Sequence, residues 1–150
     1  MFFDQAKIHV AAGKGGHGCV SFRREKHVPR GGPDGGDGGR GGDVLLVVDA
    51  QARDLQLFSH KVHFKAGSGQ AGKGAKKHGA RGETARIPVP IGTQVWVEGE
   101  REPRLIADLV RADQELVVAR GGAGGRGNAR FTTSVHQAPK FAELGEDGES

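Results

Sequence analysis

Short hydrophobic runs, separated by glycine, proline and charged residues, are the main pattern along this chain. Alternating or continuous apolar positions over about five residues are typical of β-strands. No stretch repeats an apolar face over three helical turns. The pattern predicts strands at residues 7–11, 19–24, 44–48, 62–65, 85–89 and 93–97, and a hairpin of residues 104–109 and 115–119 that turns near residues 111–114.

Two stretches are ambiguous. Residues 54–58 fit one helical turn, and the apolar positions within residues 105–110 also fit one face of a helix. Short strands with Gly and Pro turns predict a mainly β fold, with a barrel or sandwich as its base. The residues predicted to form its core are Val20, Phe22, Val44, Leu46, Val48, Val89, Val95, Leu109 and Val118.

Glycine-rich stretches with a period of three lie between these runs. In residues 31–42, glycine fills most of two of the three columns, and the third holds Asp34, Asp37 and Arg40. A polyproline II helix has three residues per turn, so the columns become faces, two of them almost without side chains. Such faces allow extended segments to pack backbone to backbone and to exchange hydrogen bonds.

The same period recurs in residues 13–18 and 121–127, and in a looser basic form in residues 67–82. We therefore predict a bundle of left-handed polyproline II-type helices that projects from the β base as insertions between strands. Four unrelated flexible loops are the alternative, because polar glycine-rich segments are often disordered. In the bundle, the structural glycines are Gly32, Gly35, Gly36, Gly38, Gly39, Gly41, Gly121, Gly124 and Gly127.

Composition narrows the class of protein. The length of 150 residues predicts a single domain over residues 1–150, and 27 glycines without a continuous Gly-X-Y repeat exclude collagen. The lone Cys19 excludes an intrachain disulfide, and the N-terminus lacks the pattern of a signal peptide, so a cytoplasmic location is predicted. The longest aliphatic run, residues 44–48, is too short to cross a membrane. A net charge of +4 and a pI of about 9.5 favour a polyanionic partner.

Several apparent motifs do not fit their structural context. Four matches to G-x-G-x-x-G occur, but none is followed by the helix that a dinucleotide site requires. Residues 67–74 match the phosphate-binding P-loop except at the last position, where Gly74 replaces the Ser or Thr that binds Mg²⁺. His60 and His63 have metal-like spacing without a carboxylate or thiolate cluster, which favours ordinary surface or strand histidines. We predict no catalytic, cofactor-binding or metal-binding residues.

The sequences of three stretches, at residues 21–42, 118–128 and 137–143, resemble the Obg family of bacterial GTPases. Residues 21–42 look like the family signature, and residues 118–128 and 137–143 are similar to two further family segments. The resemblance covers nearly the whole chain. It implies the Obg fold, in which a glycine-rich bundle of left-handed extended helices stands on a β-barrel base.

The resemblance also implies a function. Full-length members continue into a Ras-like G domain that binds and hydrolyses GTP with Mg²⁺, but this sequence has no complete P-loop, D-x-x-G or N-K-x-D. It is therefore expected to be an N-terminal domain without the GTPase domain, and not an enzyme by itself. The family relationship implies binding to the large ribosomal subunit, with rRNA near the peptidyl transferase region as the partner. It further implies a role in large-subunit assembly and stress response, and contact with the G domain of the same protein.

Basic residues are the candidates for contact with RNA phosphates. They are Arg23, Arg24, Lys26, Arg30, Arg40, Lys73, Lys76, Lys77, His78, Arg81, Arg126 and Arg130. A protein-interaction module that docks on the G domain or on stress-response partners is the alternative. A third interpretation is that the charges only keep a glycine bundle soluble. Asp34 and Asp37 would repel phosphate unless they bind base amino groups, Mg²⁺ or nearby arginines, and the sequence does not decide among these roles.

Overall fold

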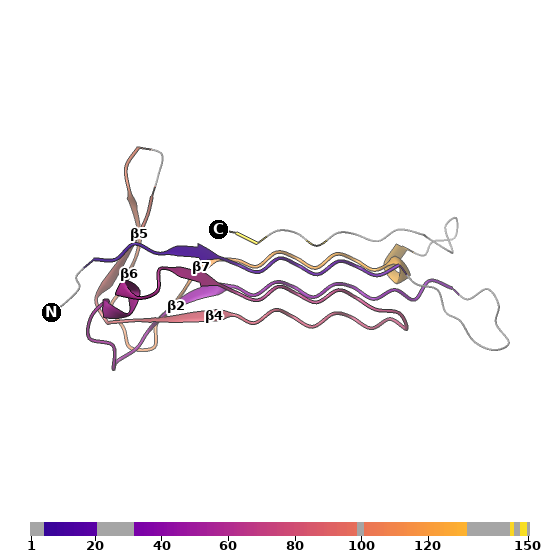
Figure 1. The fold of residues 1–150 in the computed structure, drawn as a ribbon, viewed down its shortest axis with the longest axis horizontal. Helices are drawn as coiled ribbons and strands as arrows, with labels where there is room; N and C mark the ends of the chain where they lie inside the picture. Colours follow the sequence, from indigo (N-terminus) through magenta and orange to yellow (C-terminus); the bar gives the residue numbers. More distant parts are fainter. Residues whose placement is uncertain (1–4, 21–31, 99–100, 132–144, 146–147, 150) are drawn as a thin grey trace.

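The hydrophobic runs form a β base, and the glycine-rich stretches form a long bundle that extends from it (Figure 1). The structure is a computed structural model that describes residues 5–20, 32–98, 101–131, 145 and 148–149. Its strands are β1 (His9–Ala11), β2 (Val44–Val48), β3 (His63–Lys65), β4 (Ala85–Val89), β5 (Thr93–Val97), β6 (Arg104–Leu109) and β7 (Glu115–Ala119). The helices of the described residues are two 3-10 turns, η1 (Gln56–Ser59) and η2 (Asn128–Phe131). The mainly β prediction is confirmed.

Three small sheets make up the base. β1 pairs with β3 in parallel, and β5 pairs with β6 antiparallel. In the third sheet, β2 lies between β4, to which it is parallel, and β7, to which it is antiparallel. No helix among the described residues is both long and apolar enough to span a membrane.

The predicted hairpin of residues 104–109 and 115–119 is wrong in its pairing, although both strands form. β6 pairs with β5, and β7 pairs with β2. The intervening turn carries the chain from one sheet to the next. Asp113 has a left-handed φ of 61°, and Gln114 Oε1 accepts hydrogen bonds from the N–H groups of Val110 and Arg111. The alternating pattern identifies a strand, but it does not identify the partner of that strand.

The core lies around β2, and Val44 and Val48 are among its least exposed residues. Phe58 and Phe64 pack edge to face with ring centroids 5.7 Å apart. The predicted core residues Val44, Leu46, Val48, Val89 and Leu109 are buried, and Val95 and Val118 are partly buried against them.

The prediction that Val20 belongs to the core is wrong, because this residue is 47% exposed. Val20 follows Cys19, whose N–H donates to Gly36 in the bundle, and residues 19 and 20 form no strand. The rest of the predicted strand at residues 19–24, including Phe22, lies outside the described residues.

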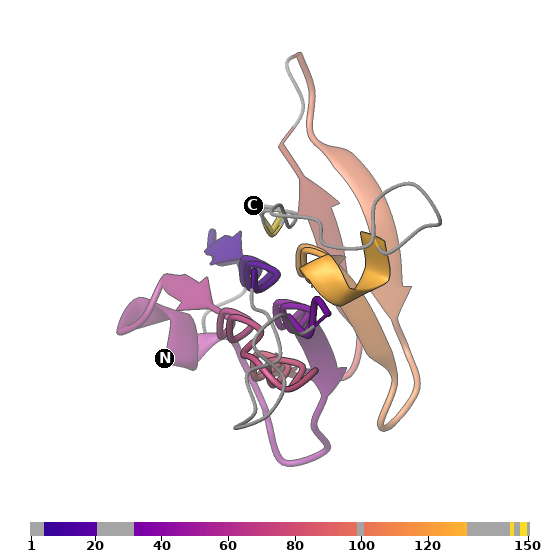
Figure 2. The same ribbon diagram turned by 90° about the vertical axis from the view of Figure 1, so that its right-hand side faces the viewer.

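The bundle consists of extended segments that continue the strands of the base. Residues 12–20 follow β1, residues 32–43 precede β2, and residues 120–128 follow β7. A long hairpin joins β3 to β4 through an outward arm, residues 66–73, and a returning arm, residues 77–83. The segments run side by side in Figure 1, and each projects as a small triangle when viewed end-on in Figure 2.

Hydrogen bonds join neighbouring segments at every third residue. Residues 32–43, which we call the central segment, contact all the others. Their N–H groups at Gly36, Gly39 and Gly42 donate to the outward arm, and those at Gly38 and Gly41 donate to residues 120–128. The spacing matches the three-residue period of the sequence. The left-handed polyproline II conformation of each segment stays a prediction.

Candidate nucleic-acid interface

The end of the bundle farthest from the base carries the densest basic cluster among the described residues. We call this end the tip; it comprises residues 34–37 of the central segment, 73–78 of the hairpin and 126–128. Lys73, Lys76, Lys77 and His78 are all exposed there. A glycine-rich hairpin offers no apolar surface that could cover these side chains, so the positive charges face outward.

The other candidate residues are more dispersed. Arg81 is exposed on the returning arm and Arg126 is exposed at the tip. Arg40 lies near the base, where its Nη2 is 3.3 Å from Asp43 Oδ1. Arg130 lies within η2. Arg23, Arg24, Lys26 and Arg30 fall outside the described residues.

Asp34 contacts the hairpin turn at residues 74–77, which we call the basic turn. Its Oδ2 accepts a hydrogen bond of 3.0 Å from the N–H group of Ala75, and its carbonyl oxygen accepts one of 2.5 Å from the N–H group of Lys76. Its Oδ1 is buried and accepts no hydrogen bond from the described residues. The carboxylate is therefore directed at the hairpin backbone.

Asp37 joins two segments at the tip. Its Oδ1 accepts a 2.9 Å hydrogen bond from Gly127 N–H, and its own N–H donates to His78 Nδ1 at 2.9 Å. His78 Nδ1 also lies 3.6 Å from Asp37 Oδ2. The backbone hydrogen bond from Asp37 is therefore the shorter of the two contacts between these residues.

Asn128 was not singled out as a site residue from the sequence, yet it is fully buried at the tip. Its side-chain Oδ1 accepts a 2.8 Å hydrogen bond from Gly35 N–H. Nearer the base, Gly38 and Gly41 donate in the same way to main-chain carbonyls of Gly125 and Gly122. The acceptors at positions 122, 125 and 128 are thus three residues apart, and the last of them is the side chain of Asn128. A polar residue directly after a glycine-rich period is the signal that could have identified it.

The predicted structural glycines, with one exception, lie where a side chain would meet backbone. A Cβ added at Gly35, Gly36, Gly38, Gly39, Gly41, Gly121, Gly124 or Gly127 would lie 1.8–2.2 Å from a carbonyl oxygen. On the central segment, Gly38 and Gly41 face residues 12–20, whereas Gly36 and Gly39 face the returning arm. Gly32 differs, because a Cβ there would meet no atom within 4 Å.

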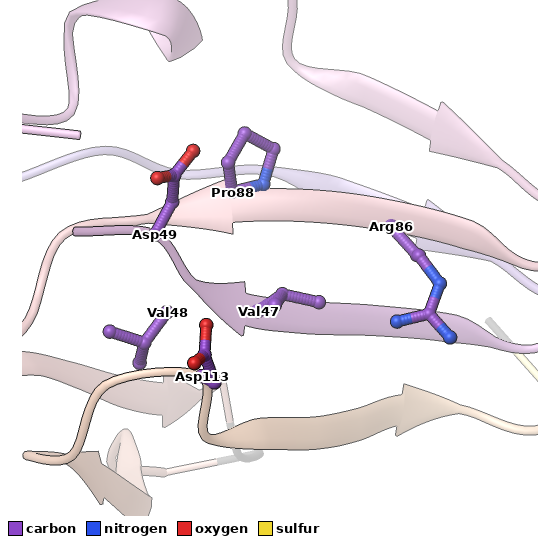
Figure 3. Close-up of a pocket in the computed structure, with 6 residues that line it drawn as sticks. All are labelled: Val47, Val48, Asp49, Arg86, Pro88 and Asp113. Atoms are coloured by element: carbon purple, nitrogen blue, oxygen red, sulfur yellow. The ribbon is translucent and has the colours of Figure 1, made fainter. Parts of the chain in front are cut away.

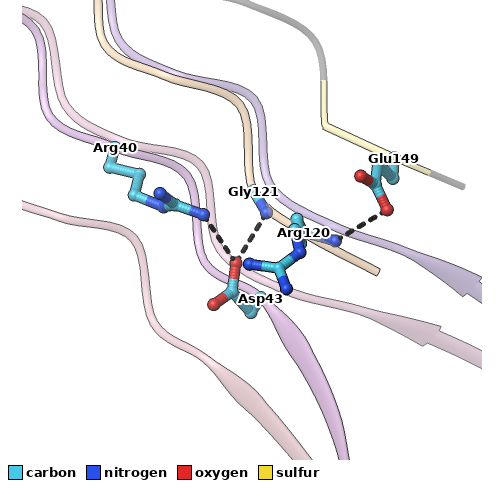
Figure 4. A network of polar contacts seen from close by, with 5 residues as sticks. All are labelled: Arg40, Asp43, Arg120, Gly121 and Glu149. Atoms are coloured by element: carbon cyan, nitrogen blue, oxygen red, sulfur yellow. Dashed lines mark hydrogen bonds and ion pairs between the residues drawn. The ribbon is translucent and has the colours of Figure 1, made fainter. Parts of the chain in front are cut away.

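A second polar network joins the bundle to the base (Figure 4). Asp43 Oδ1 accepts hydrogen bonds from Gly121 N–H at 2.7 Å and from Arg40. The hydrogen bond from Gly121 N–H, followed by the Arg40 guanidinium, holds the pKa of Asp43 below its ordinary value. Glu149 Oε2 accepts from Arg120 N–H at 3.2 Å, and Glu149 main-chain groups bond to Ala12 and Arg120. Residues 43, 120 and 149 therefore tie three segments together where they leave the base.

Residues 67–74, the stretch that resembles a P-loop, form part of the bundle and of its hydrogen bonding. Gly67, Gly69 and Gly72 donate their N–H groups to the carbonyls of Glu83, Lys14 and His17, which leaves none of these donors for a phosphate. The residues therefore do not fit GTP. No group of three or more His, Cys, Asp or Glu in the described part of the chain could hold a metal ion. His63 stacks on His9 with centroids 5.0 Å apart, and it lies exposed on β3.

A shallow hollow on the base lies apart from the tip (Figure 3). Its volume is about 260 Å³, and it is lined by Val47, Val48, Asp49, Arg86, Pro88 and Asp113. The Arg86 guanidinium pairs with Glu115 at 2.7 Å, and Asp49 Oδ1 accepts the N–H of Gln51. Two of the charged side chains in the lining are therefore engaged by other residues of the chain.

The chain matches a protein-family model described as GTP1/OBG over residues 3–150. It is 56% identical over 149 residues to a protein of Desulforudis audaxviator named GTPase Obg, covering 99% of this chain and 35% of the relative. Proteins of the same name from Persephonella marina and Moorella thermoacetica are 53% and 54% identical, again over 99% of this chain, and over 43% and 35% of their own lengths. The chain thus spans less than half the length of these curated relatives.

Proposed function

The chain belongs to the GTP1/OBG family, and from this premise we propose that it is a ribosome-binding domain that contacts rRNA of the large subunit through the tip of its bundle. The observation that carries the proposal is the exposed cluster of Lys73, Lys76, Lys77 and His78 on a turn far from the base. A lysine ammonium binds a phosphate whatever the base sequence. A lysine cluster therefore suits recognition of a folded RNA by its shape and backbone.

The shape of the molecule supports this proposal. Backbone hydrogen bonds along the bundle hold the basic turn at a distance from the β base (Figure 1). A narrow bundle without bulky side chains on its inner faces can enter a confined RNA cavity, such as the peptidyl transferase region. In full-length members, we propose that GTP and Mg²⁺ bind elsewhere in the protein, and that the whole protein acts in large-subunit assembly and stress response in the cytoplasm.

The experiment measures cosedimentation of this chain with large ribosomal subunits across a range of salt concentrations. The double variant Lys76→Ala, Lys77→Ala is expected to bind more weakly and to flatten the salt slope by up to about two. Each phosphate contact that is lost no longer contributes its share of counterion release to binding. Arg101→Ala, Arg104→Ala is the matched control, since it removes the same charge from exposed positions on the base. Equal slopes for wild type and the lysine variant would refute an RNA contact at the tip.

A second candidate function is docking of a protein partner, either the family's G domain or a stress-response protein. On the β5–β6 hairpin, Trp96 and Leu105 lie directly opposite each other and are 55% and 44% exposed. An exposed cross-strand apolar pair that includes a tryptophan suits a protein contact. Trp96→Ala should then weaken the binding of a protein partner and leave the binding of ribosomal RNA unchanged.

A further inference from the structure

We infer that Asp34 is a positioning residue for the basic turn, which it holds in a left-handed conformation that directs Lys76 and Lys77 toward phosphate. This inference rests on the proposed RNA-binding function and deepens it. Asp34 and the turn are 41 residues apart in the sequence, and they meet only at the tip of the bundle.

The turn itself has an unusual backbone. Lys77 N–H donates to the carbonyl of Gly74 at 3.3 Å, and Lys73 N–H donates to that of Lys77 at 2.8 Å. Between them, Ala75 and Lys76 have φ values of 58° and 56°. Two consecutive left-handed residues form a type I′ turn, a position normally taken by Asn and Gly because other side chains disfavour this region. The sequence at this turn does not by itself favour the conformation that it adopts.

Asp34 compensates for this unfavourable sequence. The two N–H groups of the left-handed residues point to the same partner, with Ala75 bonded to the Asp34 carboxylate and Lys76 to the Asp34 carbonyl. A hydrogen bond to a carboxylate is stronger than one between neutral groups. Asp34 is itself fixed, because the next residue, Gly35, donates to buried Asn128 and Gly36 donates to Lys73. The turn is therefore tied to the middle of the bundle.

Asp34 can change the affinity for RNA either through its charge or through the conformation of the turn, and these two effects have opposite signs. A carboxylate close to Lys76 repels an approaching phosphate, so a residue that acted only through its charge would weaken RNA binding, and its removal would tighten it. A residue that positions the turn strengthens binding, since only the fraction of molecules with the competent turn binds RNA. Removal of Asp34 therefore distinguishes the two effects.

The test measures binding of this chain to large ribosomal subunits, and its salt slope, for a set of variants. Asp34→Ala is expected to lower the affinity about three- to tenfold, as the competent turn becomes a minor conformation, and to leave the salt slope unchanged, because the molecules that bind still make the same phosphate contacts. Asp34→Asn keeps an acceptor for Ala75 N–H and is expected to retain most of the affinity. In the Asp34→Ala background, Ala75→Gly is expected to recover binding, because glycine adopts the left-handed region without assistance.

Ala75→Val provides a variant that changes no charge and leaves Asp34 in place. A β-branched residue opposes the left-handed region more strongly than alanine, and position 75 is exposed, so the bundle should fold while binding weakens. Hydrogen exchange of the Ala75 and Lys76 amides should accelerate in Asp34→Ala, whereas exchange of the Gly16 amide near the middle of the bundle should not.

The outcomes separate the two proposals. If Lys76→Ala, Lys77→Ala leaves binding unchanged, the proposed RNA contact of the tip fails. If that variant weakens binding but Asp34→Ala and Ala75→Val bind as wild type does, or Asp34→Ala binds more tightly, the positioning role alone is overturned.

Discussion

Three aspartates of the central segment share one structural task. The carboxylates of Asp34, Asp37 and Asp43 each accept a main-chain N–H from another segment, namely that of Ala75, Gly127 or Gly121. Because glycine has no side chain, a bundle of glycine segments has few other groups that could complete its hydrogen bonding. The polar column of the three-residue pattern provides these acceptors. Its aspartates thus have a structural role within the bundle.

Asp43 gives a prediction for the pH dependence of stability. The pKa of this carboxyl is lowered in the folded state from its ordinary value of 3.8, so the charged form favours folding. The contribution is complete above pH 3.8 and is lost as the pH falls through the lower folded pKa. Asp43→Asn should therefore reduce the free energy of unfolding at pH 7 by about 1 kcal/mol, and by less near pH 3.

Denaturant unfolding of both proteins at the two pH values measures this effect. Asp108→Asn is the control, since the Asp108 side chain is exposed on β6 and should change stability little at either pH. A stability difference for Asp43→Asn that stayed constant between pH 7 and pH 3 would show that its charge does not support the fold.

At the scale of elements, the bundle segments pack through bare backbone and not through side chains. The glycines of the central segment approach carbonyls of residues 12–20 on one face and of the returning arm on another. Val44 and Val48 in the adjacent strand, by contrast, are buried among apolar side chains. The same stretch of chain thus changes its mode of packing at Asp43, where the glycine period ends and the aliphatic run begins.

Gly38 and Gly32 test this mode of packing with the same substitution. A Cβ at Gly38 would lie 1.8 Å from the Gly16 carbonyl oxygen, whereas one at Gly32 would meet nothing within 4 Å. We expect Gly38→Ala to lower the free energy of unfolding by about 3 kcal/mol, at the upper end for overpacking, because backbone cannot rotate away as a side chain can. Gly32→Ala should stay within about 0.5 kcal/mol of wild type. Denaturant midpoints measure both, and equal midpoints for the two variants would contradict backbone packing in the bundle.

Local patterns predicted the strands well but not their partners. The bounds of β2, β4, β5, β6 and β7 follow from runs of apolar residues that are visible in the sequence. Pairing depends on contacts between distant residues, so the chain order β6–β7 suggested a hairpin that does not form. The same reason left Asn128 and the role of Asp34 unpredicted, since their partners lie 93 and 41 residues away.

For the whole molecule, the sheets of the base set the register of the bundle. Val44 pairs with Ala85 in parallel, and beyond this pair Gly82 donates to Arg40, then Gly79 to Asp37, each step moving three residues on both segments. Val44 also pairs with Ala119, and Gly41 and Gly38 continue that ladder to Gly122 and Gly125. The tip is therefore aligned by strands at the opposite end of the molecule.

This continuity predicts that removing three residues harms the fold less than removing one. Deletion of Gly38 alone shifts the distal central segment by one residue and brings Asp37 to the place where a Cβ would lie 1.8 Å from the Gly16 carbonyl oxygen. Deletion of residues 38–40 shifts it by a full period and brings Gly35 there instead. Because hydrogen bonds and bare faces both repeat every three residues, the longer deletion preserves the packing near the base and loses only contacts at the tip.

We expect the one-residue deletion to have the lower denaturant midpoint, and to lose amide protection at Gly16 and Gly125, which the three-residue deletion should keep. A lower midpoint for the three-residue deletion would show that the length of the segment, rather than its phase, determines stability.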